Sequence, residues 1–102
     1  MTAYVISEVE VVDEELADRY RALAEASLSR FGGRYLVRGA GPEAVEGAWP
    51  AARRMVVVEF PDMRRAEEWY ASAEYAEALG VAKTALRRRL LFVEGVGGGA
   101  PV

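Results

Sequence analysis

Two kinds of hydrophobic period alternate along this chain, and their order is the feature that most constrains its fold. Residues 3–12 (AYVISEVEVV) repeat every second position and are rich in β-branched side chains, which is typical of a β-strand. One face of this strand would carry Val5, Ser7, Val9 and Val11. Residues 14–31 place apolar side chains every three or four positions, which predicts an amphipathic helix. Asp13 is suited to cap its start, and Gly32 and Gly33 are suited to end it.

The middle of the chain predicts two further strands. Residues 34–39 (RYLVRG) alternate again, and the glycines and the proline within 39–42 would break or bulge this second strand. Residues 43–47 (EAVEG) are expected to resume it as a short edge piece. Residues 54–60 (RMVVVEF) form the most hydrophobic stretch and predict a central strand.

The last third predicts helix and then strand. Asp62 and Ser72 are placed as N-caps of two consecutive helical segments that run to about Ala85. Residues 89–96 (RLLFVEGV) predict a fourth strand. The resulting β-α-β-β-α-β order is that of a ferredoxin-like α+β fold, in which an antiparallel four-stranded sheet carries both helices on one face.

The sheet of such a fold has one face that the helices leave open. We expect residues 1–96 to form a single domain of this kind and the glycine-rich residues 97–102 to be a flexible tail. The open face then meets water, a ligand or a second subunit, and its predicted residues include Ile6, Leu36, Val57 and Phe92. A largely apolar open face on a small domain predicts a homodimer.

Charge and composition exclude several classes of function. The net charge is −3 with no histidine and no cysteine, which removes disulfides, thiolate nucleophiles and the usual zinc and haem ligands. No metal or cofactor site and no nucleotide-binding loop is predicted. The basic run 87–89 is either a solvated helix end or an anion patch, and nucleic acid is not an expected partner. The chain begins without a signal peptide and holds no membrane-spanning run, so we expect a cytoplasmic protein.

Each predicted strand carries a charge that a β-strand does not need. If the strands share one open face, three carboxylates and two guanidiniums converge there: Glu8, Glu59 and Glu94 with Arg34 and Arg38. One interpretation is an ion-pair network at an interface. The other is the polar floor of a ligand cavity, where a glutamate of raised pKa acts as a general acid or base. The sequence leaves both open, and a register slip of one residue would scatter the cluster.

The aromatic residues also allow two interpretations. Trp69 and Tyr70 are adjacent on a predicted helix, so we expect one in the core and the other bordering the open side. Trp49 lies in a loop and would be a lid over a pocket, an anchor into a partner subunit or a surface residue. Tyr20 and Tyr75 are expected to be core or hydrogen-bonded tyrosines, and they are also candidates for contact with a ligand.

Four stretches resemble a known family. RFGGRYLVRG (30–39), VEG with a following tryptophan (45–49), VVVEFPDMRRAEEWYASAEY (56–75) and LFVEGV (91–96) are similar to the family described as domain of unknown function 1330. This resemblance spans nearly the whole chain and implies a dimeric α+β barrel, in which two sheets face each other and enclose a cavity. One departure is KTALRRR (83–89), which is more basic and bulkier than the family pattern. The resemblance marks these positions without assigning roles: Tyr20, Gly32, Gly33, Arg34, Arg38, Gly39, Glu46, Gly47, Glu59, Phe60, Trp69, Tyr70, Ser72, Tyr75, Glu94 and Gly95.

Two functions fit these observations, and the sequence does not decide whether the chain is an enzyme. The first is a cofactor-free tailoring enzyme, similar to an isomerase or monooxygenase, that binds an apolar or aromatic metabolite. Arg38 would orient an anionic oxygen and Glu59 or Glu94 would move a proton. Its ligand contacts would be Tyr20, Arg34, Trp49, Trp69, Tyr70 and Tyr75. The second is a non-catalytic dimeric binding or structural module whose strand charges form an ion-pair network.

Overall fold

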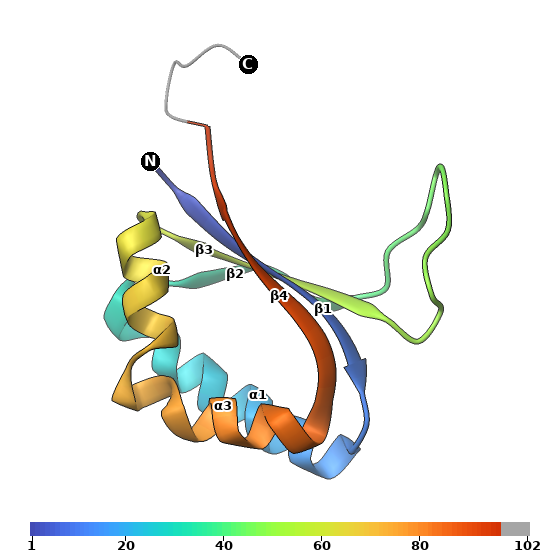
Figure 1. The fold of residues 1–102 in the computed structure, drawn as a ribbon, viewed down its shortest axis with the longest axis horizontal. Coiled ribbons are helices and arrows are strands. Elements are labelled where there is room, and N and C mark those ends of the chain that lie inside the picture. Colours follow the sequence, from blue (N-terminus) through green and yellow to red (C-terminus); the bar gives the residue numbers. More distant parts are fainter. Residues whose placement is uncertain (97–102) are drawn as a thin grey trace.

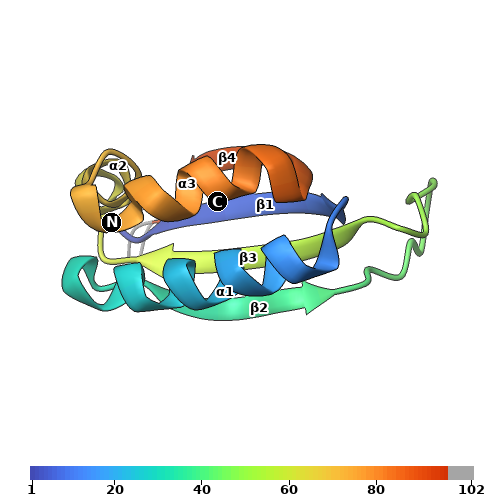
Figure 2. The same cartoon turned by 90° about the horizontal axis from the view of Figure 1, so that it is seen from below.

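A four-stranded antiparallel sheet with helices on one face makes up the computed structural model, which describes residues 1–96 (Figures 1 and 2). Its elements are β1 (Ala3–Val11), α1 (Glu14–Leu28), the 3-10 helix η1 (Ser29–Phe31), β2 (Arg34–Ala40), β3 (Arg54–Phe60), α2 (Met63–Tyr70), α3 (Ala73–Ala85) and β4 (Leu86–Glu94). The strand order is β2-β3-β1-β4, and all three neighbouring pairs are antiparallel. The predicted ferredoxin-like α+β fold is therefore confirmed. The predicted tail, residues 97–102, lies outside the described residues.

Side-chain caps set the starts of the helices, as the sequence predicts. The Asp13 carboxylate accepts a hydrogen bond from the Leu16 amide at 3.0 Å, and the Asp62 carboxylate accepts one from the Arg65 amide at 2.8 Å. The Ser72 hydroxyl accepts one from the Tyr75 amide at 3.1 Å, which begins α3 directly after α2. Gly32 ends the first helical stretch with φ 76°, a left-handed conformation that glycine adopts readily.

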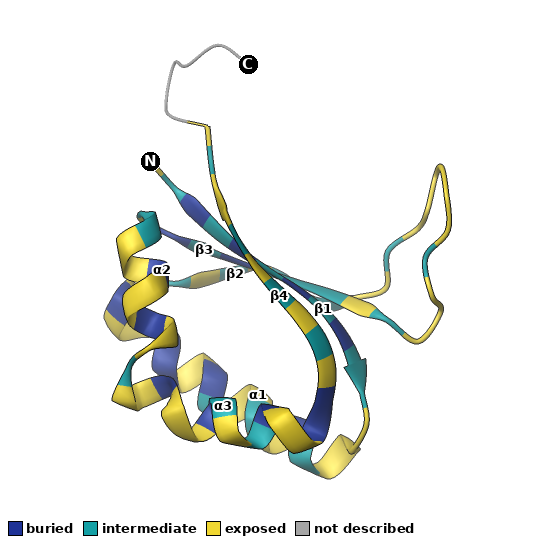
Figure 3. Ribbon diagram, viewed as in Figure 1, coloured by how far each residue is buried: buried dark blue, intermediate teal, exposed yellow. Residues whose placement is uncertain are grey.

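The core lies between the helices and the face of the sheet that they cover. Figure 3 shows buried positions on the inward sides of the helices and at alternate positions of the strands. Phe60 and Tyr75 are the largest fully buried side chains, and Trp69 packs between them with ring centroids 5.4 and 4.1 Å away. Aromatic residues of this size contribute much of the burial that stabilises a small domain. They place α2 and α3 firmly on one face of the sheet.

Two irregularities change the faces of β2. Tyr35 pairs with Val58, but the next paired residue is Val37, opposite Val57. This β-bulge adds one residue on β2, so each later side chain turns to the other face. A second irregularity follows at Gly39, where φ is 81°. The predicted break or bulge near Gly39 is thus confirmed. The predicted edge strand at 43–47 is wrong, since residues 41–53 form a loop that extends beyond the sheet (Figure 1).

The last strand begins earlier than the sequence suggests. α3 ends at Ala85 and β4 starts at Leu86, so the basic run 87–89 lies within a strand and not at a helix end. Arg88 pairs with Val9, whose side chain is buried beneath the helices. Arg87 and Arg89, one residue away on either side, lie on the open face.

Candidate functional site

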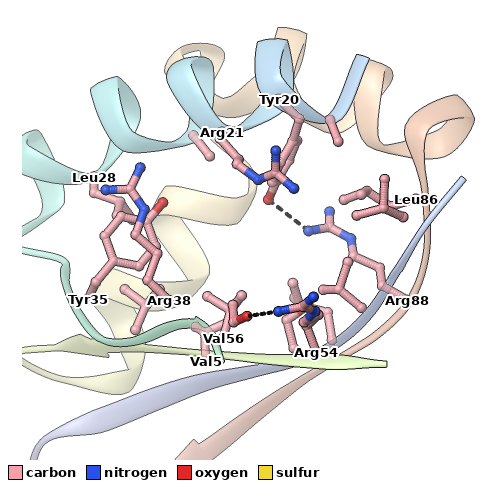
Figure 4. A pocket seen from close by; sticks show the side chains of 18 of the residues that line it. Val5, Tyr20, Arg21, Leu28, Tyr35, Arg38, Arg54, Val56, Leu86 and Arg88 are labelled. Carbon is pink, nitrogen blue, oxygen red and sulfur yellow. Dashed lines mark hydrogen bonds between the residues drawn. The ribbon is translucent and has the colours of Figure 1, made fainter. Parts of the chain in front are cut away.

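A cavity of about 410 Å³ lies between α1 and the helix-covered face of the sheet (Figure 4). Its volume falls within the range that is usual for small-molecule sites. Most of its wall is apolar, with side chains from β1, β3, β4, α1 and α2: Val5, Val9, Val11, Val56, Val58, Leu86, Leu90, Ala17, Ala24, Leu28 and Trp69. The cavity lies within one chain, whereas the family resemblance implied a space between the sheets of two chains.

The polar part of the cavity wall is mostly cationic. Arg21, Arg38, Arg54 and Arg88 line it, together with the single carboxylate of Glu14. The chain as a whole has a net charge of −3, so positive charge is concentrated here against the overall balance. Charges that line a concave, partly apolar site focus the electrostatic potential inside it. The cavity is therefore suited to groups that are negatively charged or rich in electrons.

At one end of the cavity, Arg88 connects two tyrosines. Its guanidinium donates to the Tyr20 hydroxyl at 2.7 Å and to the Tyr75 hydroxyl at 2.9 Å. The two hydroxyls lie 2.8 Å apart and also share a hydrogen bond. Tyr20 comes from α1 and Arg88 from β4, as Figure 4 shows, and Tyr75 belongs to α3. One polar cluster is thus held by α1 together with the consecutive elements α3 and β4.

Two tyrosine hydroxyl protons are present in this cluster, and only one of them has an acceptor within it. Arg88 only donates, so one tyrosine must supply the proton between the two hydroxyls. Tyr75 is fully buried and has no other hydrogen-bond acceptor for its hydroxyl among residues 1–96. Its proton therefore bonds to Tyr20. Tyr20 lines the cavity, and its own proton is left to donate to whatever occupies the cavity.

Burial keeps Tyr75 neutral. Removal from water raises the pKa of the Tyr75 hydroxyl well above its ordinary value, and this exceeds the opposing effect of Arg88, whose charge and hydrogen bond lower the pKa. Tyr75 is therefore a protonated hydrogen-bond donor across the physiological pH range. This supports the arrangement in which Tyr75 donates to Tyr20.

Ser7 is a polar side chain in the apolar floor. It is only 5% exposed, it lines the cavity, and its Oγ is the one buried side-chain oxygen or nitrogen in the described part of the chain that has no hydrogen-bond partner. Buried hydroxyls are normally hydrogen-bonded, because an unsatisfied one loses its bonds to water without compensation. Ser7 is therefore available to a bound molecule.

The four cavity arginines differ in their partners. Arg38 donates to Glu25 at 3.0 Å and lies 4.4 Å from the ring centroid of Tyr35, and Arg21 bonds to Asp18 at 2.5 Å. Arg54 makes only a long contact of 3.4 Å to the carbonyl of Gly39. Within residues 1–96, neither Arg54 nor Arg88 has a carboxylate oxygen within 4.0 Å.

The predicted cluster of strand charges on one face does not form. Arg34 and Glu59 are on the open face and pair at 2.7 Å. Arg38 is on the opposite, helix-covered face, because the bulge in β2 reverses its direction. Glu94 pairs with the buried Ala3, which places it on the helix-covered side as well, and Phe92 shares that side. The prediction that all these residues share the open face is wrong.

The aromatic candidates separate into two groups. Tyr20 and Trp69 line the cavity, and Tyr75 supports Tyr20 from behind. Tyr70 is exposed, with its ring centroid 5.9 Å from that of Phe92, and is not part of the cavity wall. The prediction that one of the adjacent pair Trp69 and Tyr70 packs in the core is confirmed.

Trp49 lies away from the cavity. Its indole Nε1 donates to the carbonyl of Arg53 at 2.7 Å, within the loop that joins β2 to β3. In a single chain it therefore closes its own loop and does not cover the pocket.

Among the cavity residues that went unrecognised as site residues in the sequence are Ser7, Arg54 and Arg88. Ser7 gave a signal, since it is the single hydroxyl on the valine face of the first strand. Arg88 gave a weaker one, because alternation within the run 87–89 turns only its middle residue inward.

The open face of the sheet has an apolar centre with paired charges around it. Ile6 lies between Val57 on β3 and Leu91 on β4, and Leu91 is exposed. Glu8 accepts from Arg89 at 2.9 Å, and the guanidinium of Arg53 lies 3.8 Å from the same carboxylate. These pairs complement the Arg34–Glu59 pair.

Two classes of site are not found in the described residues. Across 1–96, no three His, Cys, Asp or Glu residues are grouped closely enough to hold a metal ion. No helix in the same range is both long and apolar enough to cross a membrane.

Solved structures of this fold include proteins with and without a known activity. RPA0582, a protein of unknown function from Rhodopseudomonas palustris, has a TM-score of 0.77 and 16% identity, covering 94% of this chain and 83% of its own. SnoaB, a cofactor-independent oxygenase from Streptomyces nogalater, has a TM-score of 0.69 and 8% identity, covering 94% of each chain. A dimeric ferredoxin-like protein of unknown function from Jannaschia sp. CCS1 has a TM-score of 0.64 and 15% identity, covering 93% of this chain and 100% of its own. At these identities the likeness establishes the fold alone.

Sequence comparison assigns the family. No curated protein matches the chain. Residues 2–96, nearly the whole chain, match the family described as domain of unknown function (DUF1330). This agrees with the motifs at 30–39 and 56–75 and with the ferredoxin-like fold. The chain therefore belongs to the DUF1330 family.

Proposed function

We propose that this protein is a homodimer that binds a small apolar or aromatic metabolite in the cavity between α1 and the sheet. The observation that carries the proposal is the cavity itself, which has a mainly apolar wall and a few convergent polar groups. This combination is typical of small-molecule sites. The ligand's body would contact the valines of β1 and β3 together with Leu28 and Trp69.

The dimer is supported by the open face of the sheet. Leu91 and Val93 are large apolar side chains that remain exposed there, beside Ile6 and Val57. An apolar centre with charged pairs at its edge is the usual composition of a protein interface. The fold neighbour from Jannaschia sp. CCS1 is a dimeric ferredoxin-like protein, which also supports a dimer.

A second candidate function is catalysis without a cofactor. It is favoured by the proton of the Tyr20 hydroxyl, which is free to donate into the cavity, and by the oxygenase activity of the fold neighbour SnoaB. In this version Tyr20 donates a hydrogen bond to a carbonyl or enolate oxygen of the bound molecule. Tyr20→Phe would then retain the ligand but stop its conversion, which a turnover assay on the released ligand would measure.

Native mass spectrometry tests the main proposal. We expect gently ionised protein to appear as a dimer that carries a discrete small mass, released by rising collision energy. Ala24→Leu should reduce this adduct, because Ala24 is buried in the cavity wall and a larger side chain fills the space. The matched control is Ala22→Leu, two residues away on the exposed side of α1, which should leave the adduct intact. A dimer that binds no small molecule, even after incubation with apolar metabolites, would contradict the proposal.

A further inference from the structure

We infer that the end of the cavity beside Arg88 is an oxyanion site, so that the ligand is an organic anion with an apolar body and its charge on oxygen, such as a carboxylate. This inference rests on the proposed function, since it assigns the ligand chemistry of the same cavity. It is carried by three residues of the cavity wall: Arg88, Ser7 and Tyr20.

The guanidinium of Arg88 lacks a compensating negative charge. Arg88 is half-buried, and its partners are two neutral hydroxyls and not a carboxylate. A guanidinium withdrawn from water is normally matched by an anion, because the cost of desolvation is otherwise uncompensated. Arg54, which also lines the cavity, likewise has no carboxylate within 4.0 Å in the described range 1–96. A bound anion would supply the missing charge for Arg88, and the exposed Arg54 at the cavity wall would add to its attraction.

Ser7, Tyr20 and Arg88 all have hydrogen-bond donors to spare. The Ser7 hydroxyl is buried without a partner, and the Tyr20 hydroxyl already accepts from Arg88, so its proton is free. Arg88 has further N–H groups beyond the two that bond to the tyrosines. The Ser7 proton, the Tyr20 proton and the remaining N–H groups of Arg88 can each donate a hydrogen bond, and none of them has an acceptor within this group of residues. A carboxylate, with two acceptor oxygens and no donor, is the complementary group.

Ser7 and Arg88 lie near each other on the covered face of the sheet. Ser7 on β1 pairs with Leu90 on β4, and its neighbour Val9 pairs with Arg88. Ser7 and Arg88 are therefore diagonal neighbours on the same face, a separation of about 7–8 Å that a long side chain or a bridging ligand spans. Figure 4 shows Tyr20 entering the same end from α1, opposite Arg88. We expect the head group of one ligand to lie between Ser7, Arg88 and Tyr20.

Competing charges at the cavity are already satisfied. Glu14, the single carboxylate of the wall, lies 4.0 Å from Arg21 and so faces a cation of its own element. Arg38 is paired with Glu25. The charge left over at the cavity is that of Arg54 and Arg88, which is why the site favours an anion over a neutral molecule of the same shape.

Isothermal titration with matched ligand pairs tests the inference. The probes are benzoate, 1-naphthoate and octanoate, each compared at neutral pH with the uncharged amide of the same skeleton. We expect at least one carboxylate to bind about tenfold more tightly than its amide, since hydrogen bonds to a charged group are stronger than those to a neutral one.

Three variants locate the site. Ser7→Ala should weaken carboxylate binding severalfold and leave amide binding within about twofold, because it removes one donor and little volume. Arg88→Met should weaken carboxylate binding by about tenfold or more. Arg87→Met is the matched control, since Arg87 is the adjacent residue on β4 and its side chain lies on the open face. Carboxylate affinity should remain unchanged in this control.

Each alternative result has a distinct meaning. If amides bind as tightly as carboxylates, the oxyanion site is refuted while the proposed cavity ligand remains supported. If neither class binds, both the site and the proposed function fail. If Ser7→Ala weakens both classes equally, the serine acts through structure and the inference is overturned. If Arg88→Met fails to fold, the Ser7→Ala variant still tests whether the oxyanion site exists.

Discussion

The two faces of the sheet differ in how their arginines are paired. On the open face, Arg34 and Arg89 each meet a carboxylate of a neighbouring strand. Arg34 bonds to Glu59 at 2.7 Å, and Arg89 bonds to Glu8 at 2.9 Å. Their charges cancel around an apolar centre. Such a surface exposes little uncompensated charge, which suits contact with another protein.

On the helix-covered face Arg38 is paired with Glu25, but Arg88 is bound to hydroxyls. Arg88 is less exposed than Arg89, its neighbour in the chain, yet its hydrogen-bond partners are the hydroxyls of Tyr20 and Tyr75. The positive charge without a carboxylate partner is thus that of Arg88, the less exposed of these two arginines. We propose that the cancelled charges on the open face would serve association and that the surplus charge on the covered face would be matched by a ligand. Fold stability alone would favour the opposite distribution, since a buried cation without an anion is costly.

The largest effect should follow from a charge at the centre of the open face. Ile6→Asp places a carboxylate between Val57 and Leu91, and burying it in a dimer should cost about 3–5 kcal/mol. This corresponds to more than about a hundredfold weaker association. Analytical ultracentrifugation should show monomers, with circular dichroism still native.

The control for this variant is Val45→Asp, in the loop between β2 and β3. Val45 is 89% exposed, so the same substitution should leave the dimer unchanged. An Ile6→Asp protein that remains a dimer at low micromolar concentration would show that the open face is not the interface.

Replacing two buried serines by alanine should change the free energy of unfolding by smaller amounts and in opposite directions. Ser27 is 2% exposed, donates to the carbonyl of Ala24 at 2.6 Å and accepts from the indole of Trp69 at 2.9 Å. Ser27→Ala leaves the buried indole N–H without a partner and should lower the free energy of unfolding by about 2 kcal/mol. Ser7→Ala removes an unsatisfied hydroxyl and should raise it by about 1 kcal/mol.

Urea unfolding of the ligand-free protein measures both values. The two sites are matched in residue type and burial and differ in their hydrogen bonds, so each is the control for the other. Equal losses in the two variants would indicate that Ser7 has a partner in solution, and the argument from its free hydroxyl would no longer stand.

Alternation and capping made most of the fold predictable from the sequence. The strand at 3–12 and the caps Asp13, Asp62 and Ser72 depend on local chemistry, and all are found in the structure. The helix end at about Ala85 was predicted, but the start of the last strand at Leu86 was not, because the run 87–89 has the charge of a solvated helix end and no apolar alternation of its own. Only pairing with β1 makes it a strand.

The site was predicted far less well than the fold, and one reason is a single inserted residue in β2. Alternation alone places Arg34 and Arg38 on one face, but the bulge near Leu36 separates them. No side-chain preference in RYLVRG reveals this bulge, since it is set by the register of β2 against β3. Tyr20, Trp69 and Tyr75 were identified because aromatic residues on helices predict burial whichever way a strand is turned.

The smallest effect that distinguishes the faces is a dependence of stability on alkaline pH. Burial raises the pKa of Tyr75, and it also raises the pKa of Tyr35 on the covered face, where the charge of Arg38 opposes the shift. Above about pH 10 the tyrosines of the unfolded chain lose their protons while these two keep theirs. The unfolded state then binds fewer protons, so the free energy of unfolding falls as pH rises. One such tyrosine contributes a slope of at most about 1.4 kcal/mol per pH unit.

Substitution by phenylalanine separates this titration from ordinary destabilisation. Tyr75→Phe lowers stability at neutral pH because the Tyr20 and Arg88 bonds are lost, but between pH 9.5 and 10.5 its further fall should be smaller than that of the unmodified protein. Tyr35→Phe should reduce the fall independently, and the double variant should reduce it most. Urea midpoints at half-unit pH steps supply the comparison. Parallel curves for all four proteins would mean that neither tyrosine keeps its proton when folded, and Tyr75 would then lose its role as the donor that leaves the Tyr20 proton free for the cavity.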